Sequence, residues 1–186
     1  MTVNGNTALL VMDVQNGIVN RVQDPSYLPR LTGAVDAARA AGVPVLYVVI
    51  GFRADHADIS ERNQSFAALP PGVFTPDDPG AAVHADVAPR AGDLTITKKR
   101  VSAFAGSDLE LVLRSRNIDH LVLTGIATSG VVLSTLRQAA DLDYRLTVLS
   151  DGCHDTDPEV HRVLVEKVFP RQSQVTTVEE WTKSLG

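Results

Sequence analysis

Two charged side chains stand where apolar runs of the sequence end, and together they could carry acid–base chemistry. Asp13 follows the apolar run 8–12, and Lys98 follows the shorter run 94–97. If both side chains share one pocket, the acid and the cation shift each other's pKa, as catalytic pairs do. The structural alternatives are that Asp13 caps a helix or turn and that Lys98 is an ordinary surface charge.

Further reactive groups follow a later apolar run. Cys153, the only cysteine, stands beside His154 after the run 146–149, and Asp151 comes just before it. Adjacent residues of an extended segment point to opposite sides, so sequence proximity does not make Cys153 and His154 a nucleophile–base dyad. A small buried cysteine that only packs is the common alternative.

These residues need a scaffold that brings strand ends together. Apolar β-rich runs alternate with helical patterns almost from end to end of the chain. The alternation predicts one domain over residues 1–186 with a three-layer αβα fold, in which helices cover both faces of a six-stranded, mainly parallel, Rossmann-like sheet. Ligands bind beyond the carboxyl ends of strands in such a sheet. The predicted strands are 8–12, 43–50, 94–97, 121–125, 146–149 and 174–176.

Capping residues predict where helices begin and end. Asp24-Pro25 predicts the start of the first long helix, and Gly42 predicts its end. Two capping boxes are predicted, Ser107 with Glu110 and Thr177 with Glu180.

Residues 51–92 are rich in Pro, Gly, Asp and Ala and lack periodicity. A loop of this length in a compact domain is often functional, so we expect it to contribute to a binding site.

Composition narrows the function classes. Hydrophobic residues make up 44% and charged residues 21% of the chain, as is typical of globular domains. The net charge of -5, with no Lys/Arg run that forms a phosphate-binding stripe, argues against nucleic-acid binding. A single cysteine excludes a disulfide framework. The N-terminus, MTVNGNTALL, lacks a signal-peptide pattern and no apolar stretch is long enough to span a membrane, so we expect a cytoplasmic protein without a membrane partner.

Three segments resemble motifs of the isochorismatase-like hydrolases, the family also called cysteine hydrolases. The segments are residues 10–16 (LVMDVQN), residues 97–104 (TKKRVSAF) followed by 106–109 (GSDL), and residues 123–128 (LTGIAT). They occur in the order and at the spacing of that family, and the resemblance extends over nearly the whole chain. Each motif alone would be weak evidence, but the three together are specific.

The resemblance implies a catalytic triad of aspartate, lysine and cysteine. Asp13 would be the acid/base and Lys98 the neighbouring cation. The nucleophilic cysteine would stand three positions after Thr128, at a helix start that lowers a thiol's pKa. Val131 occupies that position here and has no nucleophilic group. The resemblance also implies a cis peptide bond before Ala127, a homodimer or homotetramer, and an oxyanion hole. That hole is expected from Ala127, Thr128, Ser129 and Gly130.

Val131 leaves three hypotheses open. In the first, Asp13 protonates a vinyl ether or a related C–O or C–N bond of a small carboxylated metabolite, as the resemblance to isochorismatases proper implies, and Arg100 binds the carboxylate. This requires a raised pKa of Asp13, which the neighbouring lysine opposes. In the second hypothesis, Cys153 or Ser129 replaces the missing nucleophile. In the third, the protein binds a ligand or partner through the same pocket without catalysis.

Substrate-binding side chains are expected around this pocket, and no cofactor is expected. The candidates are Gln15, Asn16, Phe52, Arg53, Arg100 and Phe104, with Asn63 and Phe66 as further pocket walls. Val101 stands where isochorismatases proper usually have tyrosine. No metal site is predicted, because Asp55, His56 and Asp58 on the long loop lack the spacing of metal ligands and are interpreted as a solvated acidic loop.

Overall fold

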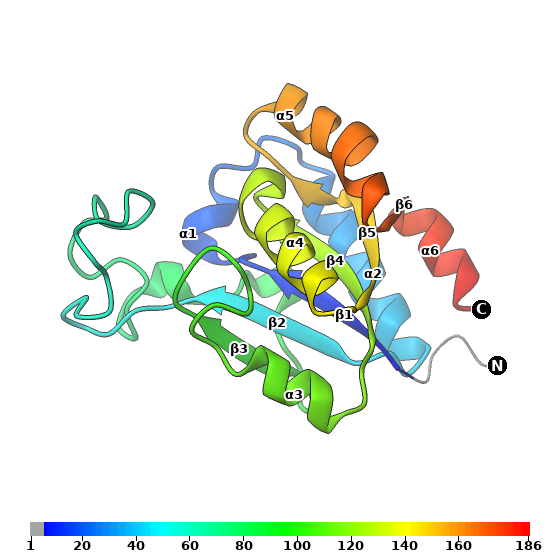
Figure 1. Cartoon of the computed structure of the whole chain (residues 1–186), viewed down its shortest axis with the longest axis horizontal. Helices are drawn as coiled ribbons and strands as arrows, with labels where there is room; N and C mark the ends of the chain where they lie inside the picture. Colours follow the sequence, from blue (N-terminus) through cyan, green and yellow to red (C-terminus); the bar gives the residue numbers. More distant parts are fainter. Residues whose placement is uncertain (1–5) are drawn as a thin grey trace.

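The computed structural model describes residues 6–186, which form a six-stranded sheet with helices on both faces (Figure 1). Residues 1–5, which begin the N-terminal segment without a signal-peptide pattern, lie outside the described residues. The strands are β1 (Thr7–Met12), β2 (Val45–Ile50), β3 (Leu94–Lys98), β4 (His120–Ile126), β5 (Arg145–His154) and β6 (Gln174–Thr176). They pair in parallel in the order β3-β2-β1-β4-β5-β6, which confirms the predicted α/β fold.

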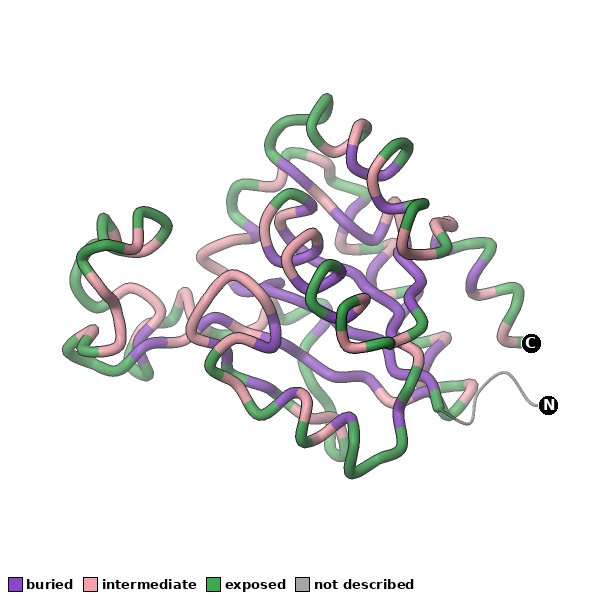
Figure 2. The backbone as a smooth tube through the Cα atoms, in the orientation of Figure 1, coloured by how far each residue is buried: buried purple, intermediate pink, exposed green. Residues whose placement is uncertain are grey.

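Side-chain alternation along the buried strands divides the apolar residues into two cores. In β1, Ala8 and Leu10 belong to one core, whereas Leu9 and Val11 belong to the other. The helices are α1 (Asn16–Val19), α2 (Tyr27–Ala40), α3 (Leu109–Ser115), α4 (Leu133–Asp141), α5 (Pro158–Val163) and α6 (Val178–Ser184). Helices α3 and α4 pack on one face, and α2 and α6 pack on the other. Figure 2 shows the buried backbone following the strands between these layers.

Some of the predicted helix boundaries are confirmed. Gly42 follows the last residues of α2 with a φ of 71°, a left-handed conformation that ends the helix. Thr177 and Glu180 form the predicted capping box at the start of α6. The prediction that Asp24-Pro25 begins α2 is wrong, because the Asp24 carboxylate accepts hydrogen bonds from the backbone N–H and hydroxyl of Ser26, and the helix starts after this turn.

The predicted capping box of Ser107 and Glu110 is also wrong. The Ser107 hydroxyl donates to the carbonyl of Ala103 at 2.6 Å, and the Glu110 carboxylate pairs with Arg114 one turn along α3. The Ser107 oxygen also accepts from the backbone N–H of Leu109 at 3.3 Å, but the Glu110 carboxylate does not reach back to complete the box. Its ion pair with Arg114 within the helix takes its place.

Strand β5 is longer than predicted and includes residues expected beyond its end. Its pairing with β4 is interrupted after Leu123 and resumes where Gly125 pairs with Cys153 and Ile126 with His154. The polar stretch 150–152 ends the apolar pattern but is accommodated as an irregularity in the ladder. Cys153 and His154 therefore lie within the sheet, at its carboxyl edge.

The segment between β2 and β3 contains no α-helix or strand, as predicted, and projects from the sheet (Figure 1). It includes only two short 3-10 turns, at Pro79–Ala81 and Ala85–Val87. Gln15, just after β1, ties the base of this segment to the sheet. Its side-chain amide donates to the carbonyls of Ile50 and Ala81, at 2.9 and 2.8 Å.

Within residues 6–186 no helix combines the length and apolar character needed to cross a membrane.

Gly125 in β4 allows the close approach that places the end of β1 beside the turn after β4. Its φ is 142°, and a Cβ atom built there would lie 2.2 Å from the carbonyl oxygen of Met12, the residue before Asp13. Only glycine fits this backbone conformation and this contact.

We predict that Gly125→Ala lowers the free energy of unfolding by about 2 kcal/mol or more, because both the backbone conformation and the contact with Met12 become unfavourable. Gly33→Ala is the matched control, since a Cβ at this exposed helical position meets nothing within 4 Å. The control should be neutral or more stable by up to about 1 kcal/mol. Urea unfolding of both variants checks this, and equal stabilities would contradict it.

Candidate active site

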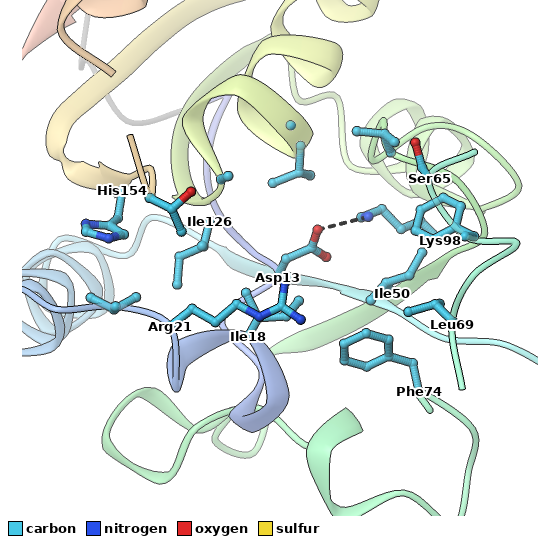
Figure 3. A pocket seen from close by; sticks show the side chains of 17 residues that line it. Asp13, Ile18, Arg21, Ile50, Ser65, Leu69, Phe74, Lys98, Ile126 and His154 are labelled. Carbon is cyan, nitrogen blue, oxygen red and sulfur yellow. Dashed lines mark ion pairs between the residues drawn. The ribbon is translucent and has the colours of Figure 1, made fainter. Parts of the chain in front are cut away.

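A cavity of about 310 Å³ opens at the carboxyl edge of the sheet, where ligands bind in parallel α/β folds. Apolar side chains supply most of its wall, and its charged or titratable residues are Asp13, Arg21, Lys98 and His154. Figure 3 shows Asp13 and Lys98 pointing toward each other inside this cavity. The other lining residues are Ile18, Val22, Ile50, Ser65, Phe66, Leu69, Phe74, Val101, Ile126, Ala127, Gly130, Val131 and Thr156.

Asp13 and Lys98 form a buried ion pair. The Lys98 ammonium lies 2.9 Å from Oδ2 of Asp13 and also donates to the carbonyl of Arg100 at 3.0 Å. Lys98 is 1% exposed and Asp13 is 7% exposed. The β2 strand lies between β1 and β3, so the pair joins two strand ends across the end of a third. The structure thus brings together the two charges that the sequence places after separate apolar runs.

Only one of the two carboxylate oxygens of Asp13 is paired. Its Oδ1 is buried and has no hydrogen-bond partner in the described part of the chain, while Oδ2 meets Lys98. Burial raises the pKa of Asp13 to about 6, although the Lys98 cation opposes the shift. A carboxyl group in this state can hold a proton near neutral pH and can deliver it to a molecule in the cavity.

Val131 lies in the cavity wall with Ala127 and Gly130, in the turn between β4 and α4. It is 2% exposed and belongs to an apolar core, so this part of the wall offers no nucleophile. The peptide bond between Ile126 and Ala127 is cis. The turn therefore has the peptide geometry that the family resemblance implied.

The other two residues expected to form an oxyanion hole do not line the cavity. The Thr128 hydroxyl is hydrogen-bonded to Nδ1 of His161 at 2.8 Å, and the Ser129 N–H donates to Asp155 at 2.8 Å. The N–H of Gly130 donates to the carbonyl of Ala127 at 3.0 Å. The backbone N–H groups of Ser129 and Gly130 thus already donate hydrogen bonds to protein acceptors.

Cys153 and His154 point to different environments, as their adjacency in a strand requires. His154 lines the cavity, whereas Cys153 is 4% exposed in an apolar core, with its sulfur 3.8 Å from the carbonyl of Leu123. Burial raises the pKa of the Cys153 thiol to about 12. A thiol in this environment is a poor nucleophile at neutral pH.

The polar side chains expected to bind substrate are engaged elsewhere. The Gln15 amide accepts from the backbone N–H of Ile50 in addition to the two bonds described above. Asn16 donates to the carbonyl of Pro79 at 3.2 Å. The Arg100 guanidinium donates to the carbonyls of Lys99 and Asp58, at 2.6 and 3.0 Å. None of these three side chains lines the cavity.

Among the remaining candidates, Phe66 lines the cavity and the others lie outside its wall. Phe52 packs edge-on against Phe66 with ring centres 5.3 Å apart, so it supports a residue that does line the cavity. The Arg53 side chain is 68% exposed and pairs with Asp58. Phe104 packs against Tyr144, and Asn63 caps a turn of the loop.

Asp58 does not belong to a solvated acidic loop, which corrects that interpretation. Its side chain is 10% exposed and pairs with Lys99 at 3.1 Å as well as with Arg53. Among residues 6–186, no group of three His, Cys, Asp or Glu side chains is placed to hold a metal ion.

Several cavity residues carried no signal in the sequence. Arg21 lies in an irregular segment after α1, and Ser65, Leu69 and Phe74 come from the long loop. The length of that loop predicted a functional role in general, but its lack of periodicity hid which side chains turn inward.

Comparisons with known proteins agree with this geometry. The isochorismatase domain family matches residues 7–180. The chain is 35% identical to the isochorismatase family protein YecD of Escherichia coli O157:H7, over 96% of both chains. It is 32% identical to the ureidoacrylate amidohydrolase RutB of Stutzerimonas stutzeri, over 82% of this chain and 71% of that protein. An isochorismatase family structure from Burkholderia thailandensis superimposes with a TM-score of 0.87 at 30% identity, covering 99% and 97% of the two chains.

We predict that the Asp13 carboxyl titrates with a midpoint of about 6, and that Lys98→Met moves the midpoint higher because the opposing cation is lost. Carbon-13 NMR of aspartate-labelled protein measures this, with the signal assigned through Asp13→Asn. Asp119 is an internal control, because its hydrogen bond with Arg145 lowers the pKa of that exposed carboxyl. A midpoint near 4 for Asp13 would contradict the burial argument.

Proposed function

The chain belongs to the isochorismatase family of hydrolases, and from that premise we propose that it hydrolyses a small-molecule substrate by proton donation from Asp13, without a covalent enzyme intermediate. The observation that carries the proposal is Oδ1 of Asp13, which is buried at the cavity and has no partner within hydrogen-bond distance in the described residues. Because the carboxyl has a raised pKa, it can hold the proton that it donates in the first step.

The proposed reaction begins when protonated Asp13 transfers its proton to a vinyl ether or to a related C–O or C–N bond. Protonation of a vinyl ether carbon leaves an oxocarbenium ion. Water adds to it and gives a proton back to the Asp13 carboxylate, and the hemiketal separates into a carbonyl compound and an alcohol. Between these two proton transfers Asp13 is a carboxylate, and Lys98 at 2.9 Å stabilises that charge. Lys98 thus favours proton release, while burial keeps the acid protonated beforehand.

The wall of the cavity supports a mechanism without covalent catalysis. By the motif resemblance, Val131 stands at the position of the family's cysteine, and Cys153 lies in the core with a raised pKa. Ser65 and Thr156 are the hydroxyl-bearing residues of the wall. Neither side chain is hydrogen-bonded to Asp13, Lys98 or His154, so no base activates it.

A ligand-binding protein without turnover is the second candidate, favoured by Val131 itself. A substrate screen distinguishes a hydrolase from a ligand-binding protein without turnover. A panel of vinyl ethers, esters and amides small enough for about 310 Å³ separates them, because the binding protein would turn over no compound.

For any compound that is turned over, we predict that Asp13→Asn lowers kcat/KM by about 100-fold or more, the usual effect of losing a general acid. Cys153→Ala should keep turnover within about 3-fold, since the thiol does not reach the cavity. Steady-state kinetics of the purified variants measures both. Asp13→Asn with unchanged kinetics would refute the role of Asp13, and loss of activity in a folded Cys153→Ala would restore the thiol hypothesis.

A further inference from the structure

Arg21 places a cation at the cavity that no described residue neutralises. Its side chain is exposed at the cavity and extends toward the region of Asp13 (Figure 3). Within residues 6–186 its guanidinium forms no ion pair and donates no hydrogen bond to a protein atom. The other permanent cation of the wall, Lys98, is already paired with Asp13.

We propose that Arg21 binds a carboxylate of the substrate and so holds the bond to be cleaved at Asp13; this rests on the proposed function above. A guanidinium presents parallel N–H donors that fit a carboxylate in a bidentate geometry. Apolar side chains, among them Ile18 and Phe74, lie in the same wall and suit the uncharged body of such a molecule. The substrate class is therefore a small monocarboxylate with an apolar core.

Arg100, the arginine expected to bind carboxylate, is a poorer candidate. Its guanidinium is held by two backbone carbonyls and does not line the cavity. A carboxylate could reach it only if those hydrogen bonds were broken. Arg21 needs no such rearrangement, because its donors have no protein acceptor among the described residues.

A carboxylate bound at Arg21 also affects the acid. The charged or titratable groups that share the cavity with Asp13 are Lys98, Arg21 and His154. Once the bound carboxylate offsets the positive charge of Arg21, the cavity holds less positive charge, and the ionised form of Asp13 is less favourable. The bound substrate therefore holds Asp13 protonated to higher pH than in the free protein.

Benzoate and benzamide, which share shape but differ in charge, test the proposal by NMR titration near pH 7. Wild-type protein should bind benzoate more tightly than benzamide. Arg21→Gln should weaken benzoate binding by about 10- to 100-fold and leave benzamide unchanged, the range expected for a charge-assisted hydrogen bond. Arg21→Lys should restore part of the difference. Arg116→Gln is the matched control, because Arg116 is an exposed arginine at the end of α3, outside the cavity.

Bound benzoate should also raise the titration midpoint of the Asp13 carboxyl, which places the ligand in this cavity. The proposal is overturned if benzoate does not bind, if it binds no better than benzamide, or if Arg21→Gln leaves benzoate binding and the Asp13 midpoint unchanged. Binding is measured without turnover, so the two proposals fail separately. Arg21-dependent binding without any hydrolysis refutes only the proposed catalysis, and Asp13-dependent hydrolysis without an Arg21 effect refutes only the carboxylate site.

Discussion

The buried pair of Asp13 and Lys98 joins the carboxyl ends of β1 and β3, and the site depends on how incompletely this pair is satisfied. Burying two charges costs free energy that their attraction offsets only when the remaining polar atoms find partners. Lys98 has a second partner in the carbonyl of Arg100, but Oδ1 of Asp13 has none. The fold thus holds an acceptor that a proton or a ligand would satisfy, in a cavity walled largely by apolar side chains.

The turn after β4 brings the remaining wall to this pair. Gly125 lets β4 approach Met12 closely, so Asp13 and the turn that carries Val131 are held by the same backbone contact. The turn contains a cis peptide bond and a sharp change of direction at Gly130, and Val131 contributes an apolar side chain to the wall there. In the mechanism that we propose, this family geometry serves a different chemistry, in which the scaffold positions the proton of Asp13.

Features that depend on local patterns could be predicted from the sequence. The apolar β-rich runs predicted the strands. The charged residues at the ends of two strands, Asp13 and Lys98, could be predicted to meet because parallel strands end at one edge of the sheet. Features that depend on tertiary partners could not be predicted. Strand β5 continues past a polar interruption because β4 offers pairing partners. The motif singled out Arg100, and nothing in the sequence pointed to Arg21. Only the folded chain shows that backbone carbonyls hold the Arg100 guanidinium, whereas Arg21 lines the cavity.

The pH dependence of kcat/KM tests the role of Asp13 most directly, because it reports which protonation state of the free enzyme reacts. If Asp13 is the proton donor, the active form is the protonated one. At low pH, kcat/KM should then be constant. Above a midpoint near 6, the pKa to which burial raises this carboxyl, kcat/KM should fall about tenfold per pH unit. A kcat/KM that instead rises through pH 6 would show that the carboxylate is the reactive form and would contradict proton donation by Asp13.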